Sequence, residues 1–140
     1  MDEKQPKGFK RAAKKANELL GNQEKLNSLI KSAKEKSKKK KKQLESVWNE
    51  LQTLLRLLKA YRKKDYREIP WRTILYATAA IIYLVNPLDF IPDFIPITGL
   101  LDDVSVITFV IASIKSDLDK FKIWEEGKLN NEDEQDTARD

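Results

Sequence analysis

The chain of 140 residues contains no cysteine and no histidine. Thiol nucleophiles, disulfide frameworks, zinc sites with Cys or His ligands, and Ser-His-Asp triads are therefore excluded. Glycine is scarce, with four residues, and none of them lies in a Gly-x-Gly or Gly-x-x-x-x-Gly-Lys pattern that would bind phosphate. Metal sites with oxygen ligands and acid–base chemistry by carboxylates remain open. No further residues that would complete a catalytic pocket are evident, so we expect that the protein is not an enzyme.

Charge is distributed unevenly between the two halves of the chain. Residues 1–68 contain 21 Lys+Arg and 9 Asp+Glu, a net charge of +12, whereas residues 69–140 contain 6 and 13, a net charge of −7. The overall charge of +5 therefore combines a basic half with an acidic half. The length has room for one domain with additional terminal segments.

The first segment, residues 1–43, is polar and lysine-rich, and we interpret it as a basic, partly helical N-terminal segment. Apolar residues at helical spacing predict a short amphipathic helix near residues 9–20, which Gly21 and Asn22 would end. The pattern recurs more weakly over residues 26–33. Because the neighbouring lysines repel one another, we expect this part by itself to be a frayed helix or a linker.

Residues 44–68 show the clearest amphipathic helix. Its apolar side consists of Leu44, Val47, Trp48, Leu51, Leu54, Leu55, Leu58 and Tyr61. Polar and charged residues occupy the opposite side, which is typical of a helix with one face against a core. Basic residues in its last turns suit the negative end of the helix dipole.

Residues 69–125 contain two apolar stretches, 70–85 and 104–124, separated by a link at residues 86–103. Pro70 is favourable at a helix start, and the prolines of the link exclude one continuous helix. We therefore predict an all-α fold: an apolar helical hairpin with a Pro/Asp-rich link, preceded by a long amphipathic basic helix. Residues 126–140 are acidic and lack a core pattern, and we expect them to be a disordered tail.

Residues 70–85 and the first half of the second stretch are apolar on all sides, and one amphipathic helix covers only one side of them. Residues 70–85 would be roughly 24 Å long as a helix, whereas a perpendicular span needs about 20 residues. We therefore expect shallow insertion into a membrane, with both termini cytoplasmic because the basic half stays on that side. The predicted membrane or partner contacts are Trp71, Ile74, Ile81, Ile82, Phe90, Ile91, Phe94, Ile95, Ile107, Phe109 and Val110.

An alternative interpretation is a soluble helical module whose hairpin is buried or meets another protein or a second copy of the chain. The short apolar stretches keep this alternative open. Five apolar residues within the link favour a membrane or partner surface, because a surface loop seldom carries so many without cover. They are Phe90, Ile91, Phe94, Ile95 and Ile97.

Two groups of charged residues are candidate sites. The link contains four carboxylates, Asp89, Asp93, Asp102 and Asp103. These would hold Mg²⁺ or Ca²⁺ as a cofactor, or else cap helices and turns, and we favour capping because two of them precede the second helix.

The second group is the lysine run Lys38, Lys39, Lys40, Lys41 and Lys42. It is a candidate contact for lipid head groups, and the alternatives are phosphate contacts to nucleic acid or a solvated charged helix. No aromatic residues interleave with the lysines to stack on bases, so we do not expect nucleic acid as a partner.

Three motifs carry a resemblance to a known family. They are Tyr-Arg-Glu-Ile-Pro-Trp at residues 66–71, Asn-Pro-Leu-Asp-Phe-Ile-Pro-Asp-Phe-Ile-Pro at 86–96, and Gly-Leu-Leu-Asp-Asp at 99–103. Over about residues 61–115 the chain resembles the YkvA-like family, domain of unknown function 1232. That family usually has Asp-Leu-Ile-Pro-Asp, and this chain has the similar Asp-Phe-Ile-Pro-Asp at residues 89–93, with Phe in place of Leu.

The resemblance implies a bacterial, membrane-associated protein with no established activity or catalytic residues. Together with the residue patterns, it leads us to expect a small membrane-associated helical protein with a structural, regulatory or interaction role.

Overall fold

The computed structural model describes residues 9–85 and 103–139, with side chains for all of these except residue 103 and residues 130–139. The helices of the described part are α1 (Phe9–Leu19), α2 (Gln23–Lys39), the short 3-10 helix η2 (Glu45–Val47), α3 (Trp48–Arg62), α4 (Trp71–Val85) and α5 (Asp103–Arg139). The predicted all-α class is therefore confirmed. The link lies outside the described residues, apart from the backbone of Asp103.

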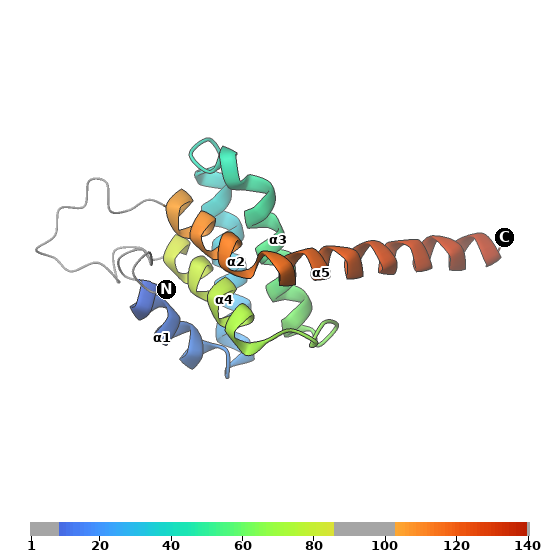
Figure 1. Ribbon diagram of the computed structural model, residues 1–140, viewed down its shortest axis with the longest axis horizontal. Coiled ribbons are helices and arrows are strands. Elements are labelled where there is room, and N and C mark those ends of the chain that lie inside the picture. Colours follow the sequence, from blue (N-terminus) through green and yellow to red (C-terminus); the bar gives the residue numbers. More distant parts are fainter. Residues whose placement is uncertain (1–8, 86–102, 140) are drawn as a thin grey trace, which may run out of the picture.

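Helix α4 is the centre of the bundle, with α1, α2, α3 and α5 packed around it (Figure 1). Its buried residues lie on every side of the helix: Thr73, Ile74, Ala77, Thr78, Ala79, Ala80, Ile81, Ile82, Tyr83 and Leu84. A helix that is apolar all round is stable in a water-soluble arrangement only when other elements cover all of its faces. The four surrounding helices provide that cover.

Helices α1 and α2 provide most of the cover of α4, and the sequence patterns did not predict this packing. Phe9, Ala12 and Ala16 of α1 are fully buried, and α1 packs along α4. The apolar face of α2 is Leu26, Leu29, Ile30 and Ala33, and it packs against α4 and α3. The lysines of α2 other than Lys36 are exposed. Burial of the weak apolar face on α4 therefore stabilises a segment that by itself would be frayed.

The ends of α2 and α3 are set by local hydrogen bonds. Asn22 caps α2, because its side-chain oxygen accepts a hydrogen bond from the backbone N–H of Lys25 at 3.1 Å. Helix α3 ends at Arg62, earlier than the predicted stretch, because Lys64 adopts a positive φ of 65°. The backbone N–H of Asp65 donates to the carbonyl of Ala60, which completes a Schellman-type turn.

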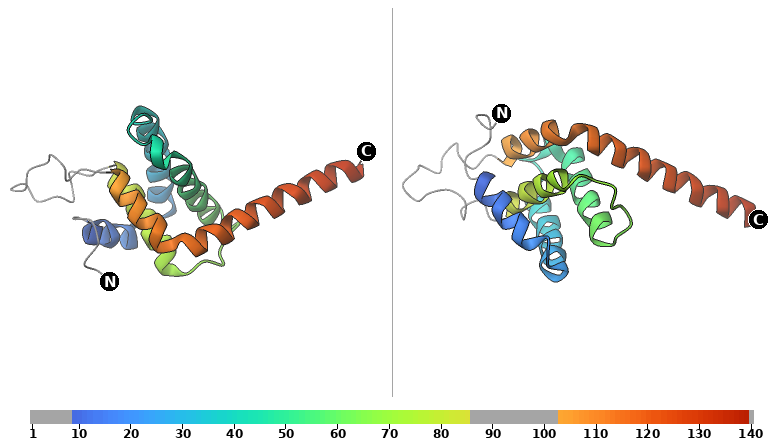
Figure 2. Two further views of the ribbon diagram at one scale, coloured as in Figure 1. Left: turned by 45° about the horizontal axis from the view of Figure 1, so that its top comes forward. Right: turned by 60° about the horizontal axis from the view of Figure 1, so that its bottom comes forward.

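Helix α5 packs on α4 through its first half and then leaves the bundle. Its backbone departs from helical geometry at Ile114, with φ −121° and ψ 20°. Beyond this kink the helix passes α3 and projects away from the other helices (Figures 1 and 2). The sequence predicted a disordered tail at residues 126–140, but the backbone is helical to Arg139. An ion pair between Lys128 and Asp65 at 3.9 Å holds the beginning of this extension.

Candidate membrane and partner surfaces

The structure places most of the described residues predicted to contact a membrane or partner inside the bundle. Ile74, Ile81, Ile82, Ile107 and Val110 are each no more than 3% exposed. Phe109 is half-buried. The exception is Trp71, which is 49% exposed at the start of α4. Phe90, Ile91, Phe94 and Ile95 lie outside the described residues, so their assignment stays a prediction.

The buried residues require a correction to the sequence-based assignment. It assumed that a single amphipathic helix covers the hairpin, whereas α1 and α2 also pack on α4. The side chains of Ile74 and Ile81 are therefore occupied by contacts within the chain rather than presented on its surface. Within residues 9–85 and 103–139, no helix combines the length and apolarity needed to cross a membrane.

Aromatic contacts hold α1 against the hairpin helices. The ring of Phe9 lies 5.0 Å from that of Tyr76 on α4 and 5.2 Å from that of Phe109 on α5, both edge-to-face. Aromatic pairs in this geometry contribute about 0.5–1.5 kcal/mol beyond their burial. Phe9 thus joins the N-terminal helix to both halves of the hairpin, and the sequence alone had suggested no partner for it.

The lysine run spans the end of α2 and the turn that follows. Lys38, Lys39, Lys41 and Lys42 are exposed, and Lys40 is half-buried at the C-cap. Cations at a helix C-terminus interact favourably with its dipole. The ammonium group of Lys41 also lies 5.4 Å from the ring centre of Trp48, in cation–π geometry.

One contact relates this basic run to the end of α4. Lys36 Nζ donates a hydrogen bond to the backbone carbonyl of Val85 at 3.2 Å. Val85 is the last residue of α4, where carbonyl groups have no partner within the helix. The C-terminal part of α2 therefore lies beside the point at which the chain enters the link.

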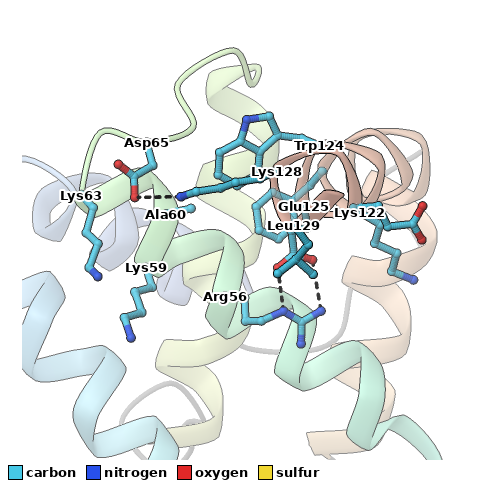
Figure 3. Close-up of a pocket in the computed structure, with 12 residues that line it drawn as sticks. Arg56, Lys59, Ala60, Lys63, Asp65, Lys122, Trp124, Glu125, Lys128 and Leu129 are labelled. Atoms are coloured by element: carbon cyan, nitrogen blue, oxygen red, sulfur yellow. Dashed lines mark hydrogen bonds and ion pairs between the residues drawn. The ribbon is translucent and has the colours of Figure 1, made fainter. Parts of the chain in front are cut away.

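A groove lies between α3 and α5, with a volume of about 740 Å³ (Figure 3). Its lining residues are Arg56, Lys59, Ala60, Lys63, Asp65, Phe121, Lys122, Trp124, Glu125, Glu126, Lys128 and Leu129. Its apolar wall includes Trp124 and Leu129, and the Leu129 side chain is 61% exposed. The sequence patterns did not indicate this groove, because its residues lie about 60 positions apart and only tertiary packing brings them together.

Two ion pairs cross the groove. Arg56 contacts both carboxylate oxygens of Glu125, with its Nε at 2.8 Å and one terminal nitrogen at 3.3 Å. Lys128 pairs with Asp65, as Figure 3 shows. The remaining cations of the lining, Lys59, Lys63 and Lys122, have no ion pair with a described residue. The groove therefore carries an excess of positive charge beside an apolar wall.

An aromatic cluster lies at the inner end of this groove. The ring of Tyr66 is 5.2 Å from Phe121 and 5.0 Å from Trp124. Burial raises the pKa of the Tyr66 hydroxyl, and the nearby carboxylates of Asp117 and Glu68 raise this pKa further. Both effects oppose formation of a phenolate anion. Tyr66 is therefore a neutral packing residue at physiological pH.

The predicted metal ligands lie almost entirely outside the description. Asp89, Asp93 and Asp102 are not described, and only the backbone of Asp103 is, as the first residue of α5. Among the described residues, no group of three or more Asp, Glu, Cys or His side chains is arranged to hold a metal ion. The Mg²⁺ or Ca²⁺ site in the link stays a prediction.

Comparison with known proteins places the hairpin in a described family. Residues 73–109, from the first turn of α4 into α5, match the family described as "Protein of unknown function (DUF1232)". The chain is 35% identical over 85 residues to a Bacillus subtilis (strain 168) protein named "Uncharacterized membrane protein YkvA". This match covers 61% of the present chain and 80% of that protein. No solved structure matches the chain. Identity at this level over most of the relative confirms the resemblance seen in the motifs, and the chain belongs to the YkvA-like DUF1232 family.

Proposed function

We propose that this chain is a non-enzymatic, membrane-associated protein with a structural or regulatory role at the cytoplasmic face of a membrane. The name of its relative, which describes a membrane protein, supports the association. Helix α4 is covered within the bundle, and the face of α5 that carries Ile107 and Val110 is buried against it, which favours attachment by one end of the bundle over insertion of the whole hairpin.

The observation that carries this proposal is the hydrogen bond from Lys36 to the carbonyl of Val85. It brings the basic end of α2 next to the start of the link, whose sequence contains Phe90, Ile91, Phe94 and Ile95. Lysines near a membrane surface contribute about 1 kcal/mol each with anionic lipids. The apolar residues in the sequence of the link would add the second signal that stable peripheral attachment requires.

In this arrangement the lysines at positions 38–42 contact lipid head groups, and the apolar residues of the link enter the interface. The acidic C-terminal segment, residues 126–140, stays away from the anionic surface because like charges repel. Both termini would lie on the cytoplasmic side, as expected for a chain whose basic half is retained there.

Vesicle flotation of the purified full chain tests the proposal. We expect flotation with vesicles of phosphatidylcholine and phosphatidylglycerol, and much weaker flotation with phosphatidylcholine alone. A variant in which Lys38, Lys39, Lys41 and Lys42 are changed to Gln should lose most of the binding. The matched control changes four exposed cations of α1, Lys10, Arg11, Lys14 and Lys15, to Gln and removes the same charge from another element.

The outcomes are distinct. Equal loss of binding in both quadruple variants would mean that net charge, rather than this end of the bundle, determines attachment. Absence of flotation with anionic vesicles, together with full recovery of the native protein in the detergent-free supernatant of lysed cells, would overturn membrane association. Protease treatment of intact spheroplasts tests the orientation, since cytoplasmic termini should be protected until the cells are lysed.

A further inference from the structure

The α3–α5 groove has the size of a small-molecule site. Its volume of about 740 Å³ lies within the range of roughly 300–1,000 Å³ that is usual for ligand pockets. The part of α3 that lines it runs from Arg56 to Lys63, which is two helical turns and roughly 11 Å. This length is short for a partner protein, because a specific protein interface buries roughly 800 Å² on each side. A small ligand therefore suits the groove better than a second protein.

The apolar wall of the groove has an aromatic base. Phe121 is only 1% exposed and Trp124 is half-buried, and their rings stack with centres 5.7 Å apart. Leu129 continues this surface outward with 61% of its side chain exposed. Ala60 lines the groove on the α3 side, where its small side chain leaves room for a ligand. Apolar surface of this kind favours burial of a hydrocarbon chain.

The rim of the groove is positively charged. The lining contains five cations and three carboxylates, an excess of two positive charges. Two of the cations form the ion pairs that cross the groove, and Lys59, Lys63 and Lys122 have no ion pair with a described residue. Figure 3 shows Lys59 and Lys63 on one side of the groove and Lys122 on the other. Lysine stems lie along apolar surface while their ammonium groups stay in water, so these cations can meet an anionic group at the mouth.

We propose that the α3–α5 groove binds a free single-chain anionic amphiphile of the fatty-acid type. Its hydrocarbon chain lies against the apolar wall, and its anionic head group lies between Lys59 and Lys63 of α3 and Lys122 of α5. Charge and apolarity together select this class of ligand. A neutral amphiphile gains nothing from the cations, and a short anion gains nothing from the apolar wall.

The position of the groove distinguishes such a ligand from a lipid of the bilayer. Tyr66 lies at the inner end of the groove and precedes α4, whereas the link follows the other end of this helix, which is roughly 22 Å long. With attachment at the link end, as proposed above, the groove is held away from the bilayer. The choice of a free ligand rests on that attachment, whereas the site itself does not.

Isothermal titration calorimetry of the purified full chain tests the proposal, with decanoate below its micelle concentration as the probe. We expect saturable binding of one decanoate per chain. Decanol has the same chain without the charge and should bind more weakly, and acetate should not bind. In the NMR spectrum of the ¹⁵N-labelled chain, the indole N–H signal of Trp124 should shift during the titration, and those of Trp48 and Trp71 should not.

The head-group contact is tested by the groove-charge variant, Lys59→Gln with Lys63→Gln. It should weaken decanoate binding roughly fivefold, because two exposed charge contacts are lost, and it should leave decanol binding unchanged. The matched control is Lys10→Gln with Lys14→Gln, an exposed pair of the same spacing on α1. This control should bind both probes as the native chain does.

The apolar part of the groove is tested by Ala60→Leu, which fills space and keeps every charge. It should weaken the binding of decanoate and of decanol alike, because the larger side chain occupies the volume of the hydrocarbon chain. The matched control is Ala13→Leu, at a half-buried alanine of α1, which should leave both affinities unchanged. Circular dichroism of each variant checks that the helical content is intact.

Three results would overturn the binding site. The first is a full chain without saturable decanoate binding, which would leave the groove to a partner protein. The second is an equal loss of affinity in the two lysine variants, which would mean general attraction between charges. The third is decanoate binding that Ala60→Leu leaves unchanged.

Vesicle flotation separates this site from the proposed membrane attachment. The groove-charge variant should float with anionic vesicles as well as the native chain does, while its affinity for decanoate falls. Loss of flotation in this variant would assign the groove to bilayer lipid and overturn the choice of a free ligand.

Discussion

The hydroxyl of Thr73 donates a hydrogen bond to Asp117 Oδ2 at 2.5 Å, which joins the first turn of α4 to α5 just after the kink at Ile114. Thr73 is only 3% exposed. The same carboxylate is one of the groups that raise the pKa of Tyr66. Asp117 therefore links the start of the hairpin to the aromatic cluster at the inner end of the groove.

Replacing Asp117 by Ala should lower the free energy of unfolding by about 1–3 kcal/mol, because the buried hydroxyl of Thr73 loses its acceptor. Urea unfolding measures this loss. Asp119→Ala is the control: it removes an exposed ion pair with Lys115 at 3.6 Å, which contributes at most about 0.5 kcal/mol. Equal losses in the two variants would contradict a structural role for the Thr73–Asp117 bond.

Phe9→Ala should destabilise the protein by about 3–5 kcal/mol, the usual cost of truncating a fully buried aromatic residue. The ring contacts Tyr76 and Phe109, so its removal also frees α1 from the hairpin. Unfolding curves and limited proteolysis of the α1–α2 region measure the two effects. Lys10→Ala, at the exposed neighbouring position, should change stability by less than about 0.5 kcal/mol. A Phe9→Ala protein as stable as this control would show that α1 does not pack as described.

The raised pKa of Tyr66 predicts a loss of stability at alkaline pH. The folded chain holds the phenol proton more tightly than the unfolded chain, in which a tyrosine has a pKa of about 10. The contribution of Tyr66 to stability is thus fully present below about pH 10 and is lost as the pH rises through the folded-state pKa. We expect the free energy of unfolding of Tyr66→Phe to fall less steeply above pH 10 than that of the native protein. Parallel pH profiles would rule this out.

Lys64→Gly should stabilise the protein by up to about 1 kcal/mol. Lys64 has a φ of 65°, in the left-handed region that glycine adopts without the steric cost of a Cβ. Lys63→Gly provides the opposite control, because Lys63 is in right-handed helical geometry with φ −76°, and glycine there should cost about 0.5–1 kcal/mol. Thermal unfolding of both variants measures the difference, and a shift of the same sign in both would contradict the assigned turn.

Several elements were predictable from short-range patterns. The apolar run that begins after Pro70 and ends before Pro87 predicted α4 closely, because proline limits a helix at both positions. The helix near residues 9–20 was likewise predicted from apolar spacing and matches α1. The end of α3 was not predicted, because glycine usually marks a left-handed C-terminal turn and here the residue in that conformation is Lys64.

The candidate site was less predictable, because its residues meet only through long-range packing. The lysine run was evident from the sequence, but its position beside the end of α4 depends on the contact of Lys36 with Val85. The groove joins Arg56 of α3 to Glu125 of α5, and no local pattern relates these residues. Ile74 and Ile81 were predicted to contact a membrane or partner, but they are buried within the bundle. An apolar side chain predicts burial and does not indicate whether lipid, a partner or another helix of the chain covers it.

The sequence by itself determined that this protein is helical, that its chemistry excludes thiols and imidazoles, and that two apolar stretches need cover. These properties follow from residue types and from the period of 3.6 residues per turn. Only the tertiary structure decided what covers them: α1 and α2 pack on α4, although their apolar faces are narrow and their lysines repel. A few small and aromatic residues, among them Ala12, Ala16 and Phe9, suffice because close helix packing depends on shape complementarity as well as on hydrophobicity.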